Sequence, residues 1–100
     1  MSEYCLNLIC PPEVEEKLLD ALLGSDDSEI FTSASIHSHG VAHGRLSAQE
    51  QVMGRSRTTQ IQVLLCKDAL TGLLERIRNE FAGAGIRYWV LPVAFEGEIK

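Results

Sequence analysis

The chain has 100 residues and a formal net charge of −5 at pH 7; 45% of its residues are hydrophobic and 23% are charged. This length predicts one domain, residues 1–100, with a core of modest size, and the composition is typical of a globular protein. The negative charge argues against nonspecific nucleic-acid binding, which depends on neutralising phosphates.

No targeting segment or membrane span is evident in the sequence. The N-terminus lacks a basic region followed by an apolar run, and no segment approaches the length needed to cross a bilayer. Cys5, Cys10 and Cys66 have no C-x-x-C spacing and fall in strand-like runs, where a free cysteine acts as a small apolar residue. We therefore expect a cytoplasmic protein with reduced thiols and no membrane insertion.

The first elements expected along the chain are a strand and a helix. Residues 4–10 alternate apolar and polar side chains on a strand period. Pro11 and Pro12 then end the strand and favour a helix start. A helix is expected over about 13–23, with Gly24 as its C-terminal cap. Its apolar stripe consists of Val14, Leu18, Ala21 and Leu22.

A second strand is expected over about 29–38, and a long polar loop follows it over about 38–57. A loop of this length is too long to be a simple connection in a compact domain, so it is either functional or disordered. Within it, residues 47–50 match the capping box and predict a short helical turn up to about Met53.

The last third of the chain repeats the strand–helix pattern. A third strand is expected over about 58–66, and Asp68 is expected to cap the helix that follows. Gly83 and Gly85 end that helix, and a final strand over about 86–95 is apolar on both faces, which predicts a central or doubly covered strand. The apolar stripe of the helix consists of Leu70, Leu73, Leu74, Ile77 and Phe81.

The resulting order is β-α-β-β-α-β, the split β-α-β or ferredoxin-like arrangement of the α+β class. It places two helices on one face of a four-stranded antiparallel sheet and leaves the other face bare. That bare face mixes polar and apolar side chains. Such a face is usually covered by another subunit.

With these elements placed, the chain resembles the PII-like superfamily of small regulators over nearly its whole length. The resemblance rests on the element order, on the single long loop, and on the run Ser38-His39-Gly40-Val41 with His43-Gly44, which looks like an uncharacterised, metal-resistance-associated branch. CutA-type divalent-cation-tolerance proteins are also similar in architecture. The resemblance implies a homotrimer whose loop docks onto a partner protein, with a membrane transporter or efflux component as the candidate.

The chain departs from PII proteins at the connection that precedes the last strand. PII proteins carry a glycine- and lysine-rich phosphate loop there, whereas this chain has Ala82-Gly83-Ala84-Gly85-Ile86 without a lysine. We therefore expect no PII-style ATP binding.

The three histidines form the most specific candidate site. His37 and His39 alternate along a strand, which places both on one face with Cβ atoms about 6–7 Å apart. His43 could supply a third nitrogen, and three imidazoles with one open position would suit a divalent copper, nickel or zinc ion. The alternative is that these are solvated histidines of a polar loop.

Arginines and glycines complete the candidate loop. Arg45, Arg55 and Arg57 could bind a phosphate or carboxylate through their guanidinium groups, or could simply keep the loop soluble. The glycines more plausibly set the loop geometry for partner binding than cradle a phosphate, since no Lys-Ser/Thr pair follows them; they are Gly40, Gly44 and Gly54.

The resemblance implies a regulator or sensor that binds a small ligand and signals to its partner through the loop over about 38–57. Catalysis has little support in the sequence, because no nucleophile-elbow pattern is present. The alternative is a ferredoxin-like oligomeric enzyme, such as a small isomerase or monooxygenase, that uses the open sheet face as its pocket. An enclosed apolar cavity over the sheet would favour the enzyme. A filled core between subunits with exposed loops would favour the regulator.

Overall fold

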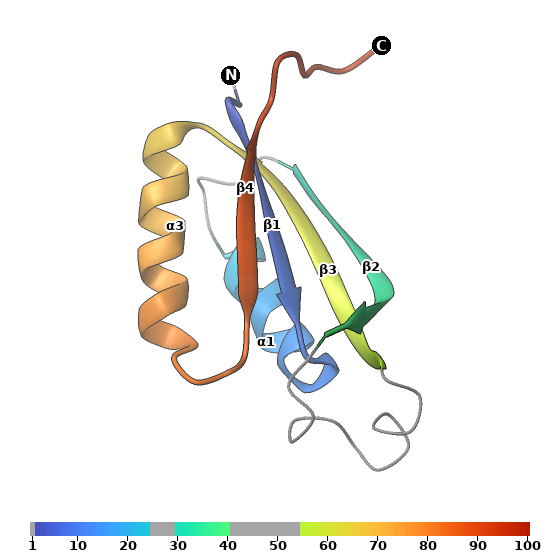
Figure 1. Ribbon diagram of the computed structural model, residues 1–100. Coiled ribbons are helices and arrows are strands. Elements are labelled where there is room, and N and C mark those ends of the chain that lie inside the picture. The colour runs from blue at the N-terminus through green and yellow to red at the C-terminus, as the bar shows by residue number, and fades with distance from the viewer. Residues whose placement is uncertain (1, 25–29, 41–54) are drawn as a thin grey trace.

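A computed structural model of the chain describes residues 2–24, 30–40 and 55–100. Within these ranges, four strands and two helices occur in the expected order (Figure 1): β1 (Tyr4–Cys10), α1 (Pro12–Leu23), β2 (Ile30–His39), β3 (Arg55–Leu65), α3 (Lys67–Glu80) and β4 (Arg87–Pro92). The strands form one sheet of order β2-β3-β1-β4, and each neighbouring pair is antiparallel. The predicted ferredoxin-like α+β fold is confirmed.

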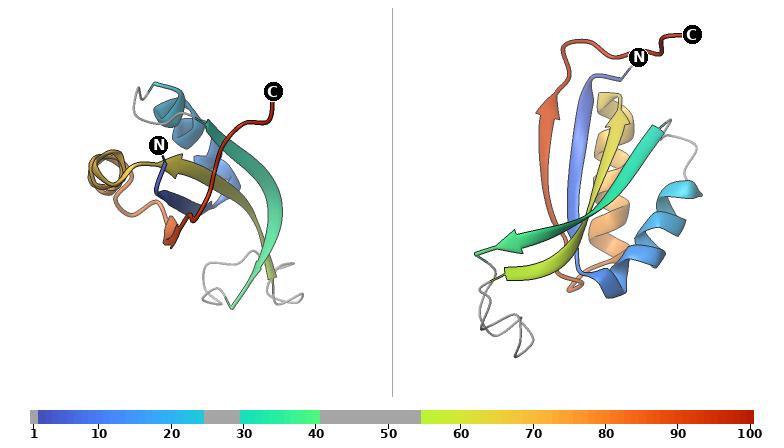
Figure 2. Two further views of the ribbon diagram at one scale, coloured as in Figure 1. Left: turned by 90° about the horizontal axis from the view of Figure 1, so that it is seen from above. Right: turned by 90° about the vertical axis from the view of Figure 1, so that its right-hand side faces the viewer.

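Both helices pack on the same side of the sheet (Figure 2, right). Every second residue of the two central strands points toward them, so Leu6 and Leu8 of β1 lie beside Val63 and Ile61 of β3. All four of these side chains are fully buried. The helices complete this core with Leu18, Leu22, Ala69, Leu73 and Ile77.

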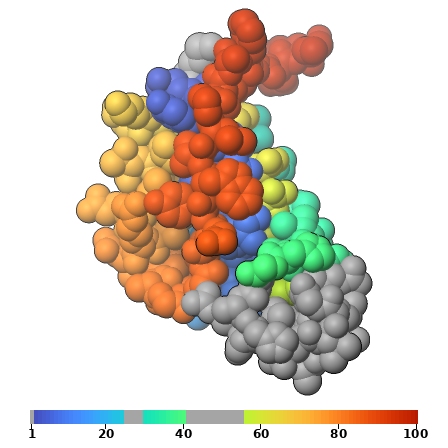
Figure 3. All heavy atoms as spheres, viewed as in Figure 1, coloured from blue at the N-terminus to red at the C-terminus, as the bar shows by residue number. Residues whose placement is uncertain are grey.

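The other face of the sheet carries no helix among the described residues, and it is the face seen in Figures 1 and 3. Its side chains form rows across the strands, because paired residues of antiparallel strands share a face. One row is apolar and the next is mainly polar. The first runs Ile30, Leu64, Cys5, Leu91, and the second runs Thr32, Gln62, Asn7, Trp89.

A short hydrogen-bonded chain fixes the middle of the polar row. Gln62 Nε2 donates to Asn7 Oδ1 at 3.0 Å, and Asn7 Nδ2 donates to the carbonyl oxygen of Cys5 at 3.4 Å. Asn7 is 2% exposed. The two bonds therefore satisfy an amide that the sheet itself buries.

The last strand differs from its prediction. β4 ends at Pro92 instead of near Phe95, and it is an edge strand rather than a central one. Trp89 is 43% exposed and Leu91 is 51% exposed. The described residues of the chain therefore do not explain why this strand is apolar on both of its faces.

The start of α3 also differs from its prediction. Cys66 occupies the N-cap position and makes no side-chain cap hydrogen bond, whereas Asp68 lies in the first turn. A carboxylate there still stabilises the helix through the macrodipole. The predicted helix start is therefore confirmed, but the N-cap is two residues earlier than predicted. No described helix is long and apolar enough to traverse a bilayer.

Candidate functional site

The strands β2 and β3 extend beyond the rest of the sheet. The last β3 partner of β1 is Thr59, opposite Cys10, whereas β3 continues to pair with β2 as far as Arg55, opposite His39. Residues 36–39 and 55–58 thus form a two-stranded ribbon that projects past β1 (Figure 2). The strands consequently take up both ends of the expected loop 38–57, and residues 41–54 lie outside the described part of the chain.

The ribbon presents His37 and His39 on one face, as the strand alternation predicted. Both are exposed. Their backbone partners across the ribbon are Arg57 for His37 and Arg55 for His39. The structure therefore places two predicted metal ligands and two predicted anion-binding residues in one strand ladder. From the sequence alone these were two separate groups.

The opposite face of the ribbon is held by a hydroxyl pair. Ser38 Oγ and Thr58 Oγ1 lie 2.7 Å apart and share a hydrogen bond. This diagonal contact pins the strand register beside the histidines. Gly40, with φ of 77°, then turns the chain out of β2 through a left-handed conformation that favours glycine.

The remaining predicted residues of the loop are His43, Gly44, Arg45 and Gly54, and they lie outside the described residues. The predicted helical turn over 47–53 lies there too. Among residues 2–24, 30–40 and 55–100, no group of three or more potential metal ligands is found. The described part of the site thus offers two imidazoles, and a third ligand would have to come from His43, solvent or another copy.

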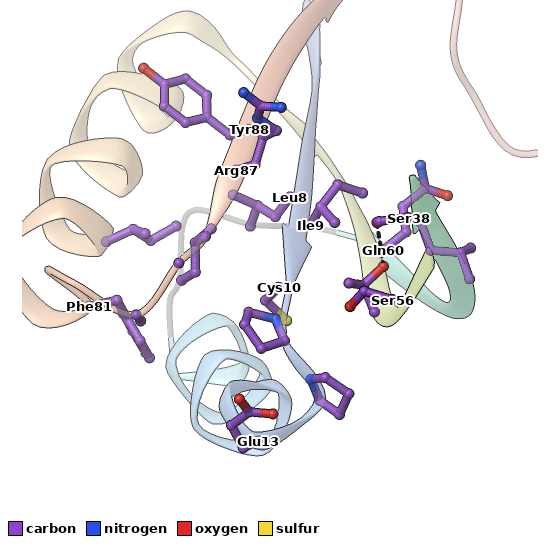
Figure 4. Close-up of a pocket in the computed structure, with 18 of the residues that line it drawn as sticks. Leu8, Ile9, Cys10, Glu13, Ser38, Ser56, Gln60, Phe81, Arg87 and Tyr88 are labelled. Carbon is purple, nitrogen blue, oxygen red and sulfur yellow. Dashed lines mark hydrogen bonds between the residues drawn. The ribbon is translucent and has the colours of Figure 1, made fainter. Parts of the chain in front are cut away.

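The ribbon forms one wall of a broad open hollow (Figure 4). Its floor is the end of β1, and its other wall is the connection from α3 to β4, where Gly85 packs near Pro11. The lining is largely apolar and neutral, and Glu13 is the one acidic residue among its described members, so its charged side chains are mostly basic. The basic or protonatable groups are His37, His39, Arg57, Arg78 and Arg87.

Two of these cationic positions come from the far wall and were missed by the sequence analysis. Arg87 opens β4, and Arg78 of α3 donates from Nη2 to the Tyr88 hydroxyl at 2.9 Å while its guanidinium carbon lies 5.9 Å from the Tyr88 ring centroid. These arginines are about 40–50 residues from the histidines along the chain. The β1–β4 pairing brings Arg87 to the same end of the sheet as the histidines, and Arg78 follows through its bond to Tyr88.

Cys10 lies beside the hollow, but its thiol is not suited to bind a metal or attack a substrate there. Its side chain is fully buried, and burial, assisted by the charges of Glu15 and Glu13, raises the thiol pKa from 9.0 to about 11. A thiol of that pKa stays protonated at neutral pH, and the thiolate is the form that binds metals or attacks substrates. The expectation that Cys10 belongs to the core is therefore supported.

These features together define a small α+β protein of PII-like architecture with a projecting ribbon beside a cationic hollow. The chain belongs to the DUF3240 family, described as "Protein of unknown function", whose match covers residues 1–100. No sequence match was found among curated proteins.

Solved structures of similar proteins agree with this assignment. A DUF3240 family protein from Shewanella baltica OS155 superposes with a TM-score of 0.82 at 16% identity, covering 100% of this chain and 99% of that one. CPII, a nitrogen regulatory PII-like protein from Thiomonas intermedia K12, gives 0.72 at 16% identity, with 99% and 98% covered. CutA1 from Pyrococcus horikoshii gives 0.72 at 14% identity, with 95% and 87% covered. The predicted likeness to PII-like and CutA folds is confirmed.

Proposed function

We propose that this protein is a small PII-like regulator that binds a small ligand at the β2–β3 ribbon and signals to a partner protein through segment 38–57. The observation that carries the proposal is the placement of His37 and His39 on one exposed face, at the point where β2 enters that segment. A ligand held there would lie directly beside the segment that is proposed to contact the partner. Ligand binding and partner binding would then be thermodynamically coupled.

The ligand class we favour is a divalent ion of copper, nickel or zinc. His37 and His39 would hold it, with His43 as the third ligand. The spacing of two residues on one strand fits a shared ion, because both imidazoles leave the same face. A bound ion would place a fixed positive charge at the start of the segment proposed to contact the partner.

The cationic rim supports a second ligand class. Arg57 lies opposite His37, and Arg87 lies across the hollow. Guanidinium groups repel a metal ion but bind carboxylate or phosphate bidentately. The similar CPII structure is described as bound to ADP, AMP and bicarbonate, so anions are a reasonable class here, although the missing lysine at 82–85 still argues against PII-style ATP binding.

The regulator would act in the cytoplasm as a homotrimer. Its exposed apolar sheet face supports self-association, and the PII-like and CutA folds support a regulatory role. A transporter or efflux component remains the candidate partner. The enzyme alternative would need an enclosed apolar pocket on the open face, whereas the hollow among the described residues is broad and open.

One substitution separates the two ligand classes by the sign of its effect. Arg57→Ala removes a positive charge beside the histidines, so it should tighten Cu, Ni or Zn binding several-fold and weaken binding of an anion such as bicarbonate or inorganic phosphate. Calorimetric titration with each probe measures both. Arg76→Ala, which removes an exposed arginine from α3, is the matched control.

The histidines themselves are tested by changing both to alanine. His37→Ala with His39→Ala should weaken metal binding by more than about a hundredfold, since losing even an outer-shell partner costs 10–100-fold. Affinity in the parent should fall as pH decreases, because protons compete for imidazole. Ser33→Ala with Ser35→Ala, on the same face of β2, is the control. Unchanged metal affinity in the histidine variant would place the site elsewhere.

A further inference from the structure

Residues 94–100, termed here the arm, follow β4 and leave the body of the protein (Figures 1 and 3). The last hydrogen bond before the arm joins the Val93 N–H to the carbonyl oxygen of Glu3 at 2.9 Å. Beyond it, no hydrogen bond or ion pair ties the arm to any described residue. Phe95 is 92% exposed and Ile99 is completely exposed.

The arm has the sequence pattern of an amphipathic strand, but it pairs with no strand among the described residues. From Phe95 to Lys100 it reads Phe-Glu-Gly-Glu-Ile-Lys, which alternates apolar or small residues with charged ones. In an extended chain this alternation places Phe95 and Ile99 on one side and all the charges on the other. One side of the arm is thus suited to bury against an apolar surface and the other to face water.

The open sheet face is the surface that fits the apolar side of the arm. It presents Leu91, Trp89 and Ile30, each at least 43% exposed. The arm of the same chain points away from this face, past the end of the sheet (Figure 2). In a second copy of the chain, the arm could cover this face, and the open sheet face of that copy would be uncovered in turn.

Charge favours this face over the helical side. The arm carries Glu96, Glu98 and Lys100, while the exterior of α1 carries Glu13, Glu16 and Asp20 with a single basic residue, Lys17, and would repel it. On the open face, the strands carry a single formal charge among the described residues, the positive Arg87. The arm therefore meets no like charge on these strands, which favours the open sheet face over α1.

We propose that the arm of one copy lies across the open sheet face of a second copy, burying Phe95 and Ile99 against its apolar row. The contact joins two different surfaces, so it repeats from copy to copy, and a closed ring of three copies is the form that the proposed homotrimer requires. This inference rests on the self-association included in the proposed function and names the segment and the surface that produce it. The contact lies at the opposite end of the sheet from His37 and His39, so ligand binding can be tested separately.

Trp89, the single tryptophan, reports on this contact because it lies on the receiving face. In the full chain, dilution should shift its emission to longer wavelength as the oligomer dissociates. Phe95→Ala with Ile99→Ala should keep the emission red-shifted at all concentrations and weaken association about ten- to a hundredfold in sedimentation equilibrium. Leu23→Ala, which removes an exposed apolar side chain at the far end of α1, should behave as the parent.

The outcomes separate cleanly. Unchanged association and emission in the arm variant would overturn the inference while leaving self-association intact. A monomeric parent would overturn both the inference and the proposed trimer. A monomer whose Trp89 emission shifts only in the variant would mean that the arm folds onto its own sheet, which also contradicts exchange between copies. Phe95→Ala alone and Ile99→Ala alone should each weaken association by less than the pair does, so the inference does not depend on one variant.

Discussion

The two faces of the sheet differ in how far their apolar side chains are buried. On the helix-covered face, Leu8 and Ile61 are completely buried. On the open face, Leu91 and Ile30 belong to equally apolar positions of the same sheet and remain more than half exposed. The difference lies in what covers each face: helices of the same chain cover the first, and no described element covers the second.

The comparison is sharpest in a pair of leucine substitutions. Leu8→Ala should lower the free energy of unfolding by about 2–5 kcal/mol, because it removes a fully buried side chain and leaves a cavity. Leu91→Ala should cost much less in the isolated subunit. Its effect should grow with protein concentration, because stabilisation by association follows mass action.

Urea unfolding over a range of protein concentrations measures both effects. The loss from Leu8→Ala should be the same at every concentration. A concentration-independent loss for Leu91→Ala would mean that the open face is not an interface, and the comparison between the faces would fail.

The sequence predicted the elements well because their signals are local. Helical stripes and strand alternation are read within one segment, and the positions of α1 and α3 follow from them. For β4 the sequence predicted a central or doubly covered strand. The sheet order places β4 at an edge, and cover by another subunit stays a prediction. A pattern of burial records every partner of a strand, including partners from another subunit.

The candidate site was predictable only in part, for the same reason. His37 and His39 are two residues apart, so strand alternation sufficed to place them on one face. Their pairing with Arg57 and Arg55 depends on the β2–β3 register, and Arg87 reaches the same hollow only through β1. Contacts between distant segments leave no local signal in a single sequence.

Cys10 extends the comparison to pH, because it belongs to the covered face. The raised thiol pKa means that the folded protein holds this proton more tightly than the unfolded chain does. The associated stability is present below about pH 9 and is lost as pH rises toward 11, since the unfolded state releases the proton first.

The measurement is the difference in unfolding free energy between the parent and Cys10→Ala from pH 8 to pH 11. The stability advantage of the parent should shrink across that window. In the native protein a thiol reagent should modify the exposed Cys66 first and Cys10 only on unfolding. A constant difference over the whole range would show that the Cys10 proton is not coupled to folding.

The polar row should be the one part of the open face that matters to a single subunit. Gln62→Ala removes the donor to Asn7 Oδ1 and leaves a buried amide oxygen without its protein partner. The expected loss is about 1 kcal/mol, the usual net value of one such bond. Gln60→Ala is the matched control, because Gln60 lies on the same face of β3 and makes no hydrogen bond through its side chain within the described residues. Chemical denaturation at the lowest workable concentration would compare the two variants. Equal losses would mean that the Asn7–Gln62 bond adds nothing to the subunit, whereas a loss confined to Gln62→Ala would identify this bond as the open face's own contribution to folding.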